Sequence, residues 1–366
     1  MKFVCEKSAL IKEIVIAQEI ISSRHTVSVL SNIYLEAADN TLIIKASDAS
    51  VTFHTKVPVS VVKEGRIMVK ADTFLGILNT IPEGEIEFEN TDVKMLIKPD
   101  FKKLSFKLNT MYTDQFPEFE NPGDAVNFEM PLEDFKGMIK QTIFSVSDDQ
   151  TRYFMNGVFF EKTDNKFVMV ATDGRRMAYA EKDIAGIVSD FKGIIIPDKL
   201  LNLILKHSSD EGNITVAIME NAIFVNFGSL YFSSKLIEGQ FPNYRRVIPE
   251  DFLYKFTVNR KEILDAFRHV ALLIEKKNKR VLFNLAKDSM SIITDDTETG
   301  MAEEEVGCKY DGEETQIAFN YEYIEDPFKI MTEEEVCFYF SEANKAVTVK
   351  PVPESYFFHV LMPMQL

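Results

Sequence analysis

A strand, a polar turn, a second strand and an aspartate recur three times along this 366-residue chain. The three segments end at Asp48, Asp173 and Asp295, which lie 125 and 122 positions apart. β-Branched and aromatic residues on both sides of an Asp/Asn turn are typical of β-hairpins. The spacing is far longer than the roughly 20–50 residues of a solenoid repeat, so each copy is expected to be a domain-sized unit.

The flanks of the three hairpins match as well. A short strand and an amphipathic helix precede each hairpin, and apolar residues follow helical spacing within residues 10–21, 132–143 and 263–273. Cap residues are expected near these helix starts, at Ser8, Pro131 and Asn259.

A second helix follows each hairpin, predicted at residues 72–81, 198–207 and 321–331, and further strands follow it. Two helices alternating with clusters of antiparallel strands favour an α+β fold. The sequence therefore predicts three tandem copies of one unit, each with the order β-α-β-β-β-α-β-β-β.

Proline-containing joints separate the copies at residues 118–124 and 244–251. We therefore expect domains at residues 1–121, 122–249 and 250–366. No apolar run approaches the roughly 18 residues of a membrane span, and the N-terminus carries no signal-peptide pattern, so a cytoplasmic protein without a membrane partner is expected. The three cysteines (Cys5, Cys308 and Cys337) show no metal or redox spacing and are predicted to be buried.

The formal net charge of −16 argues against a nucleic-acid partner when it is taken alone, because phosphate binding needs a basic surface. Net charge does not fix the distribution of charge, and a ring can be acidic outside and basic inside.

Four segments carry a family resemblance: RYFMNG at 152–157, ATDGRRMA at 171–178, SKLIEGQFPNYRRV at 234–247 and VLMPMQL at 360–366. With these segments in order inside a three-copy chain, the sequence resembles the β sliding clamps of bacterial DNA polymerase III along its whole length. The resemblance implies a head-to-tail homodimer forming a six-unit ring around double-stranded DNA, without sequence-specific recognition. It also implies a non-catalytic subunit that needs no cofactor or metal. Such a subunit confers processivity on the replicative polymerase and binds the polymerase, the clamp loader and repair proteins through short peptide motifs.

Ring closure is expected to join the end of the first copy to the third copy of a partner chain. Complementary charges and apolar residues are candidates for this dimer interface: Lys98, Lys103, Phe106 and Lys107 on one side, and Leu272, Leu273, Glu298, Glu303 and Glu304 on the other. Exposed ion pairs contribute only about 0–1 kcal/mol each, so the apolar residues should decide stability. The alternative is that both charge runs are ordinary solvated surface.

The helices are expected to face DNA through basic residues, since phosphate contacts are sequence-blind and allow sliding. The candidates on the helices are Lys12, Lys136, Lys140, Lys199, Lys206 and Arg268, and Arg24, Gln150 and Tyr153 are candidates for direct contact with a DNA strand. Where the family has Gln at position 149, this chain has Asp149 with Gln150 beside it. The alternative for each lysine is a solvated surface position.

The resemblance places a peptide-binding groove on the second copy and the C-terminus. Its candidate residues are Phe154, Met155, Thr172, Gly174, Arg175, Arg176, Met177, Pro242, Arg246, Val247, Asn320, Tyr323, Val360, Leu361, Met362, Pro363 and Met364. Flexible thioethers suit a surface that accepts varied peptides. Core packing is the alternative for Met155, Met177 and Val247. Arg175 stands where the family usually has His, and Gln365 where it has a basic residue.

An enzyme built on Asp48, Asp173 or Asp295 is the rival class of protein. Each copy holds only one such carboxylate, and no His, phosphate loop or nucleophile motif recurs with it. The three aspartates are therefore predicted to form turns. A scaffold or interaction protein that does not involve DNA is a third possibility.

Overall fold

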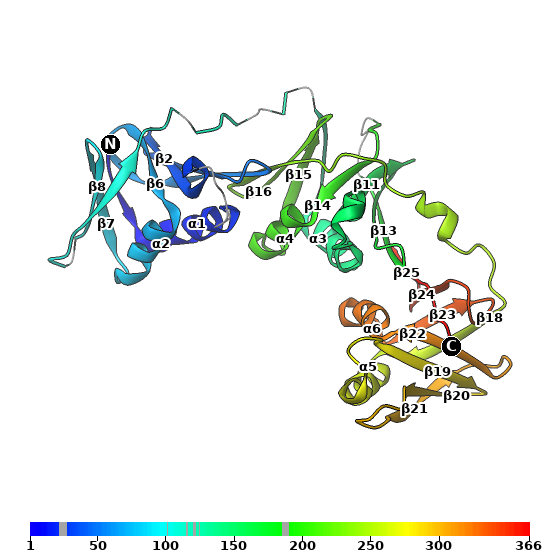
Figure 1. The fold of residues 1–366 in the computed structure, drawn as a ribbon. Coiled ribbons are helices and arrows are strands. Elements are labelled where there is room, and N and C mark those ends of the chain that lie inside the picture. Colours follow the sequence, from blue (N-terminus) through cyan, green and yellow to red (C-terminus); the bar gives the residue numbers. More distant parts are fainter. Residues whose placement is uncertain (22–27, 101, 115, 120–121, 124, 185–189) are drawn as a thin grey trace. The chain divides into compact units, whose positions relative to one another are not determined.

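The computed structural model describes residues 1–366 except 22–27, 101, 115, 120–121, 124 and 185–189 (Figure 1). The described residues form two α-helices in each of the three copies. These helices are α1 (Lys7–Ile20), α2 (Ala71–Thr80), α3 (Leu132–Thr142), α4 (Asp198–His207), α5 (Arg260–Val270) and α6 (Tyr321–Ile330).

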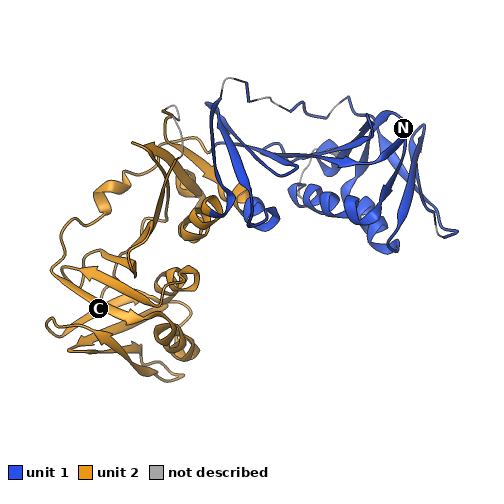
Figure 2. Cartoon of the chain, turned by 180° about the vertical axis from the view of Figure 1, so that it is seen from behind, with its two compact units in different colours: residues 1–133, 187–189, 202–236 blue, residues 134–186, 190–201, 237–366 orange. Residues whose placement is uncertain are grey.

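The chain divides into two compact units (Figure 2). Unit 1 contains residues 1–133, 187–189 and 202–236, and unit 2 contains residues 134–186, 190–201 and 237–366. The second copy of the repeat therefore contributes strands to both units.

Unit 1 holds a 13-stranded sheet in the order β10-β15-β16-β17-β4-β3-β2-β6-β9-β8-β7-β1-β5. Its strands are β1 (Lys2–Glu6), β2 (Asn32–Ala38), β3 (Thr41–Ser47), β4 (Val51–Pro58), β5 (Ser60–Lys63), β6 (Gly65–Lys70), β7 (Glu85–Thr91), β8 (Lys94–Pro99), β9 (Phe106–Met111), β10 (Val126–Pro131), β15 (Asn213–Ile218), β16 (Ala222–Phe227) and β17 (Leu230–Lys235).

Unit 2 holds a 12-stranded sheet in the order β14-β11-β12-β13-β25-β24-β23-β18-β21-β20-β19-β22. Its strands are β11 (Gly157–Thr163), β12 (Lys166–Thr172), β13 (Arg176–Asp183), β14 (Ile194–Pro197), β18 (Tyr254–Asn259), β19 (Arg280–Ala286), β20 (Ser289–Thr294), β21 (Glu303–Lys309), β22 (Thr315–Asn320), β23 (Glu335–Phe340), β24 (Val347–Val352) and β25 (Phe357–Leu361).

Antiparallel strand pairs join successive copies within each unit. In unit 1, β17 of the second copy pairs with β4 of the first. In unit 2, β13 of the second copy pairs with β25 of the third. Ladder hydrogen bonds therefore continue across the junctions between copies, and neither junction leaves these strands as open edges.

Helix pairs cover one face of the sheets in the first and third copies. Figure 1 shows α1 beside α2, and α5 beside α6. Their apolar faces pack on fully buried aromatic rings, such as Phe74 on Phe88 in the first copy and Phe267 on Phe328 in the third. The three cysteines are buried, as predicted. No helix among the described residues is long and apolar enough to cross a membrane.

The structure corrects two details of the predicted unit. Four strands, not three, lie between the two helices of the second and third copies. In the first copy there are five, because β4 and β5 are separate strands. Strand β14 of the second copy and strand β5 of the first copy have only four residues each, too few for an alternating pattern to be recognised in the sequence. Ser8 lies inside α1, whose N-cap position is Glu6. Asn259 does cap α5, because its side chain accepts hydrogen bonds from the amides of Lys261 and Glu262.

Candidate functional site

The turn from β12 to β13 shapes one side of the site. The Asp173 Oδ1 atom accepts hydrogen bonds from the amides of Arg175 (2.8 Å) and Arg176 (3.0 Å). The Thr172 hydroxyl donates to the Arg176 carbonyl (2.6 Å) and accepts from the Gly174 amide (3.0 Å). Gly174 has φ +86°, a backbone conformation that residues other than glycine rarely adopt. The segment 172–176 is therefore a self-bonded turn that projects two arginines in different directions.

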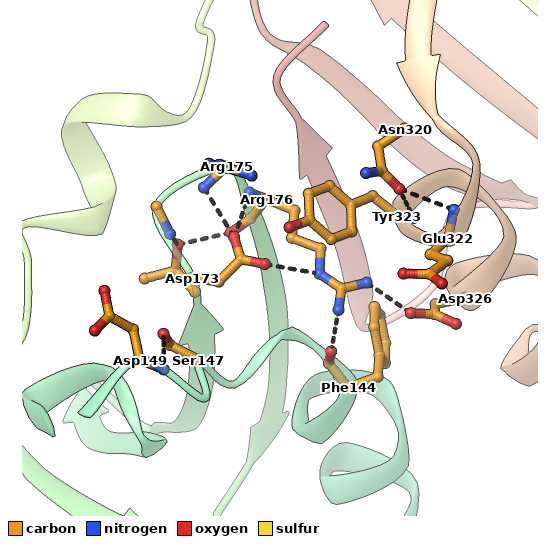
Figure 3. Close-up of polar contacts among 12 residues, drawn as sticks. Phe144, Ser147, Asp149, Asp173, Arg175, Arg176, Asn320, Glu322, Tyr323 and Asp326 are labelled. Carbon is orange, nitrogen blue, oxygen red and sulfur yellow. Dashed lines mark hydrogen bonds and ion pairs between the residues drawn. The ribbon is translucent and has the colours of Figure 1, made fainter. Parts of the chain in front are cut away.

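Arg176 is the polar centre of the site (Figure 3). Its guanidinium binds Asp173 through Nε (3.2 Å), Asp326 through Nη1 (2.7 Å) and the Phe144 carbonyl through Nη2 (2.5 Å). The Tyr323 ring lies under the guanidinium carbon at 4.4 Å. The Arg176 side chain is only 10% exposed, and an arginine so far removed from water is tolerated only when its donors and charge are matched in this way.

Asn320 fixes the start of α6, which carries two of these partners. Its side-chain oxygen accepts hydrogen bonds from the amides of Glu322 and Tyr323. Asn320 is thus a helix N-cap, and the cap sets the direction in which Tyr323 and Asp326 leave the helix.

An apolar layer lies beside Arg176 on the paired strands β13 and β25. Met177 and Val360 are cross-strand partners, and both are buried, as are Met155 and Leu361. The core-packing alternative therefore describes Met155 and Met177 in this structure. It does not describe Val247, which is 52% exposed, or Met362, which is 47% exposed. Exposed apolar residues above a buried apolar layer are typical of a peptide-binding surface.

The segment between β17 and β18 carries Pro242, Arg246 and Val247 and is held to the sheet by Glu161. The Tyr244 hydroxyl and the Arg245 guanidinium both donate to that carboxylate. Burial, together with the hydrogen bond to Glu161, raises the pKa of the Tyr244 hydroxyl, so it remains a donor. Phe241 packs in the same hydrophobic cluster as Met177 and Val360.

Backbone hydrogen bonds hold the C-terminal end of the chain at the site. The Met362 amide donates to the Arg175 carbonyl (2.9 Å), and the Met364 amide donates to the Ala318 carbonyl (2.7 Å). These bonds place the C-terminal tail, which we define as residues 362–366, between the β12–β13 turn and strand β22. Terminal residues are poorly ordered unless they are tied down in this way.

Unit 2 therefore brings the predicted groove residues together from five parts of the chain. We call them the candidate peptide surface: Phe154, Met155, Thr172, Gly174, Arg175, Arg176, Met177, Pro242, Arg246, Val247, Asn320, Tyr323, Val360, Leu361, Met362, Pro363 and Met364. The sequence interpretation missed Asp326, Phe144 and Glu161. The (i, i+3) spacing of Tyr323 and Asp326 on one helix is a signal for Asp326, whereas a backbone carbonyl such as that of Phe144 has none.

The predicted DNA-facing residues have mixed surroundings. Lys12 and Lys206 line one open pocket of about 770 Å³ in unit 1, although Lys206 also pairs with Glu19 at 2.6 Å. Arg268 is exposed and pairs with Asp265. Lys140, Gln150 and Tyr153 are exposed, and Lys199 is half-buried. Arg24 lies outside the described residues.

Lys136 corrects the DNA-facing prediction. Its side chain is only 6% exposed, so it does not present its ammonium group to a duplex. Helical spacing alone could not show that Lys136 is buried while Lys140, one turn later, is exposed. Asp149, the departure from the family pattern, caps the 3-10 helix Gln150–Met155 by accepting from the Thr151 amide at 2.9 Å. Hydrogen bonds from Thr151 and Arg152 lower the pKa of Asp149 to about 2.

The two predicted sides of the dimer interface lie in different units. In unit 1, Lys98, Lys103 and Lys107 are exposed and Phe106 is half-buried on β9. In unit 2, Leu272 is 83% exposed on the short helix after α5. Leu273 is half-buried beside it; Glu298 and Glu303 are exposed, and Glu304 contacts His269 at 2.7 Å.

The three repeated aspartates have different roles. Asp48 and Asp173 accept amide hydrogen bonds from the residues that follow them, as predicted for turn-forming residues. The prediction is wrong for Asp295, which binds the Arg280 guanidinium and the Asn278 amide group. All three carboxylates thus have structural partners within their own copies.

These features define a protein built from three copies of one α+β unit, with the candidate peptide surface in unit 2. Sequence models of three domains of the DNA polymerase III beta subunit match successive parts of the chain. The N-terminal domain matches residues 1–120, the central domain residues 129–243 and the C-terminal domain residues 245–365.

Curated relatives and solved structures agree with these matches. The beta sliding clamp of Treponema pallidum (strain Nichols) is 40% identical over 369 residues, and that of Proteus mirabilis is 31% identical over 374; both alignments cover 100% of each chain. A Pseudomonas aeruginosa sliding clamp bound to griselimycin has a TM-score of 0.95 at 27% identity over 100% of both chains. A Bacillus subtilis clamp, at 24% identity, shares the fold with a TM-score of 0.96, covering 100% of this chain and 99% of that one.

The chain belongs to the DNA polymerase III beta subunit family, the β sliding clamps. Members are non-catalytic accessory subunits that confer processivity on the polymerase, and their known architecture is a dimeric ring.

Proposed function

We propose that the candidate peptide surface is where this clamp captures the replicative polymerase, the clamp loader and repair proteins. The observation that carries the proposal is the meeting of four parts of the chain around Arg176 and Met177: the β12–β13 turn, the segment 237–248, the start of α6 and the C-terminal tail. Val247 and Met362 are the exposed apolar residues that a short peptide motif would cover.

The ring is closed by contacts between the Phe106 region of one chain and the Leu272 region of another. Leu272 supports this role because a leucine exposed to 83% on an isolated chain gains most from burial. Duplex DNA passes through the ring, with Lys12, Lys140, Lys199, Lys206 and Arg268 facing its phosphates. The domains extend over residues 1–121, 122–249 and 250–366, and the protein acts in the cytoplasm.

Deletion of residues 362–366 tests the peptide site. Strand β25 ends at Leu361, so the deletion leaves the sheet intact. A fluorescently labelled peptide copying the C-terminal tail of the cognate replicative polymerase should bind the full chain. It should bind the truncated chain at least about tenfold more weakly, the equivalent of about 1.4 kcal/mol.

A matched control removes an exposed apolar residue of unit 2 that lies outside the candidate peptide surface. Leu253 is 73% exposed, so Leu253→Ala should leave peptide affinity unchanged. Equal binding to the truncated and full chains, with unchanged thermal unfolding, would reject the peptide site.

A further inference from the structure

Arg280 contacts the C-terminal tail from strand β19. Its Nη1 atom donates a hydrogen bond to the backbone carbonyl of Gln365 at 3.2 Å. The tail is otherwise tied by the Met362 and Met364 amides described above. Arg280 therefore adds a side-chain contact beyond the last of these two backbone bonds, at the end of the chain that is most prone to fray.

Asp295 fixes the direction of that arginine. Two donors of Arg280, Nε at 3.0 Å and Nη2 at 2.6 Å, bind the Asp295 Oδ1 atom, and Nε also lies 3.2 Å from Oδ2. The Asn278 side chain donates to the same carboxylate at 3.1 Å. A guanidinium held on one side by a carboxylate points its remaining donors in a defined direction.

The strand register explains why this pair forms. Val281 and Thr294 are cross-strand partners on β19 and β20, and the next positions outward are Arg280 and Asp295. Cross-strand neighbours are close enough for opposite charges to pair. Asp48 and Asp173 accept amide hydrogen bonds within their own turns, whereas the equivalent residue of the third copy, Asp295, binds Arg280, which contacts the tail.

The tail itself lies on an edge strand. Met364 bridges to Ala318 of β22, which is the last strand of the unit 2 sheet. Ala318 pairs in turn with Leu282 of β19, two residues from Arg280. Arg280, β22 and the tail therefore form one hydrogen-bonded assembly along this edge.

We propose that Arg280, oriented by Asp295, is a positioning residue for the candidate peptide surface. By holding the Gln365 carbonyl, it keeps Met362 and Met364 in place before a peptide arrives. A C-terminal tail that is ordered before binding loses less conformational entropy when a peptide binds, so the affinity for peptides rises. This inference rests on the proposed peptide-binding function and adds to it a residue pair that lies outside the candidate peptide surface.

Two readouts on the full-length chain test the proposal. The first is hydrogen exchange of the tail amides without peptide, and the second is the affinity for the labelled polymerase-tail peptide. Arg280→Met removes the donors but keeps the length of the side chain. It should speed exchange of the Met362 and Met364 amides and weaken peptide binding, each by about tenfold, as expected for loss of one hydrogen bond from a charged donor.

Three further variants separate positioning from folding. Gln365→Ala keeps the backbone carbonyl that Arg280 binds, so it should match the native chain in both readouts. Arg280→Lys keeps a donor and should recover part of the affinity, and Asp295→Asn should fall between native and Arg280→Met. Exchange of the β19 and β20 amides should stay at the native level in all of them.

The outcomes distinguish this inference from the proposed function. If the native chain fails to bind the peptide, the proposed function is wrong, while tail exchange still tests whether Arg280 holds the tail. If the native chain binds and Arg280→Met binds equally well, the positioning role is overturned, whether or not tail exchange has changed.

Discussion

Thr52 of β4 and Ser233 of β17 are cross-strand partners whose hydroxyl oxygens lie 2.5 Å apart. Strands β13 and β25 pair in the same way in unit 2, and there the partners are Met177 and Val360. Thr52 follows Asp48 by four residues, as Met177 follows Asp173. At this one register position the junction is therefore polar in unit 1 and apolar in unit 2, and we expect a peptide surface only in unit 2.

This difference predicts one bound peptide per chain. Isothermal titration of the native protein should give a single class of sites at a ratio of one. Met177→Thr places a hydroxyl in the buried apolar layer under the candidate peptide surface and should weaken binding by about tenfold or more, whereas the volume-conserving Met177→Leu should not. A second site of equal affinity, or native affinity in Met177→Thr, would contradict the assignment.

Arg175 and Arg176 are adjacent, but we expect a large effect on stability from substitution of Arg176 and a small one from substitution of Arg175. Arg176→Ala leaves Asp173 and Asp326 without their buried cation, so unit 2 should lose about 3 kcal/mol of stability. Arg175 is exposed, so Arg175→Ala should change the free energy of unfolding by less than about 0.5 kcal/mol. Thermal denaturation of the two variants compares them directly, and equal midpoints would show that Arg176 is not the centre of the site.

His359 makes the stability of unit 2 depend on pH. Its ring is 1% exposed, and neither ring nitrogen has a hydrogen-bond partner among the described residues. Burial, with a contribution from the charge of Arg176, lowers its pKa to about 3. The unfolded chain therefore binds a proton near pH 6.5 that the folded chain does not bind. The contribution of the neutral His359 to the free energy of unfolding is therefore complete above that pH. It is lost as the pH falls toward 3, by up to about 1.4 kcal/mol per pH unit.

The variant His359→Phe removes this titration. Its unfolding midpoint should exceed that of the native chain, and the difference should grow as the pH is lowered from 7 to 4. A difference that stays constant over this range would show that His359 does not titrate on unfolding.

The sequence predicted the elements better than their partners. The six helices follow apolar spacing, and the cap at Asn259 and the turns at Asp48 and Asp173 depend on neighbouring residues only. Periodicity is local information, and it specifies these features.

Contacts between distant segments could not be predicted in the same way. Strand pairing between copies depends on register across more than a hundred residues, and Arg176 meets Asp326 150 positions away. Lys136 and Lys140 share a helix and a charge, yet only packing around the helix decides that the first is buried. The family resemblance supplied the site residues that local patterns could not.

Leu272 and Leu273 are predicted to hold the dimer together. Leu272→Ala combined with Leu273→Ala should shift the protein from dimer to monomer in sedimentation velocity, because burial of apolar area outweighs exposed ion pairs in such a contact. Leu253→Ala with Val352→Ala removes comparable exposed apolar area from unit 2 and should leave the dimer intact. An unchanged sedimentation coefficient in the Leu272/Leu273 variant would reject this interface.

Polymerase processivity on primed templates, measured with the clamp loader present, tests the central claim that the chain acts as a topological ring. The protein should lengthen the products made on a circular template. The effect should vanish on a linear template with open ends, from which a ring slides off. Equal stimulation on both templates, or none on the circle, would contradict the clamp function.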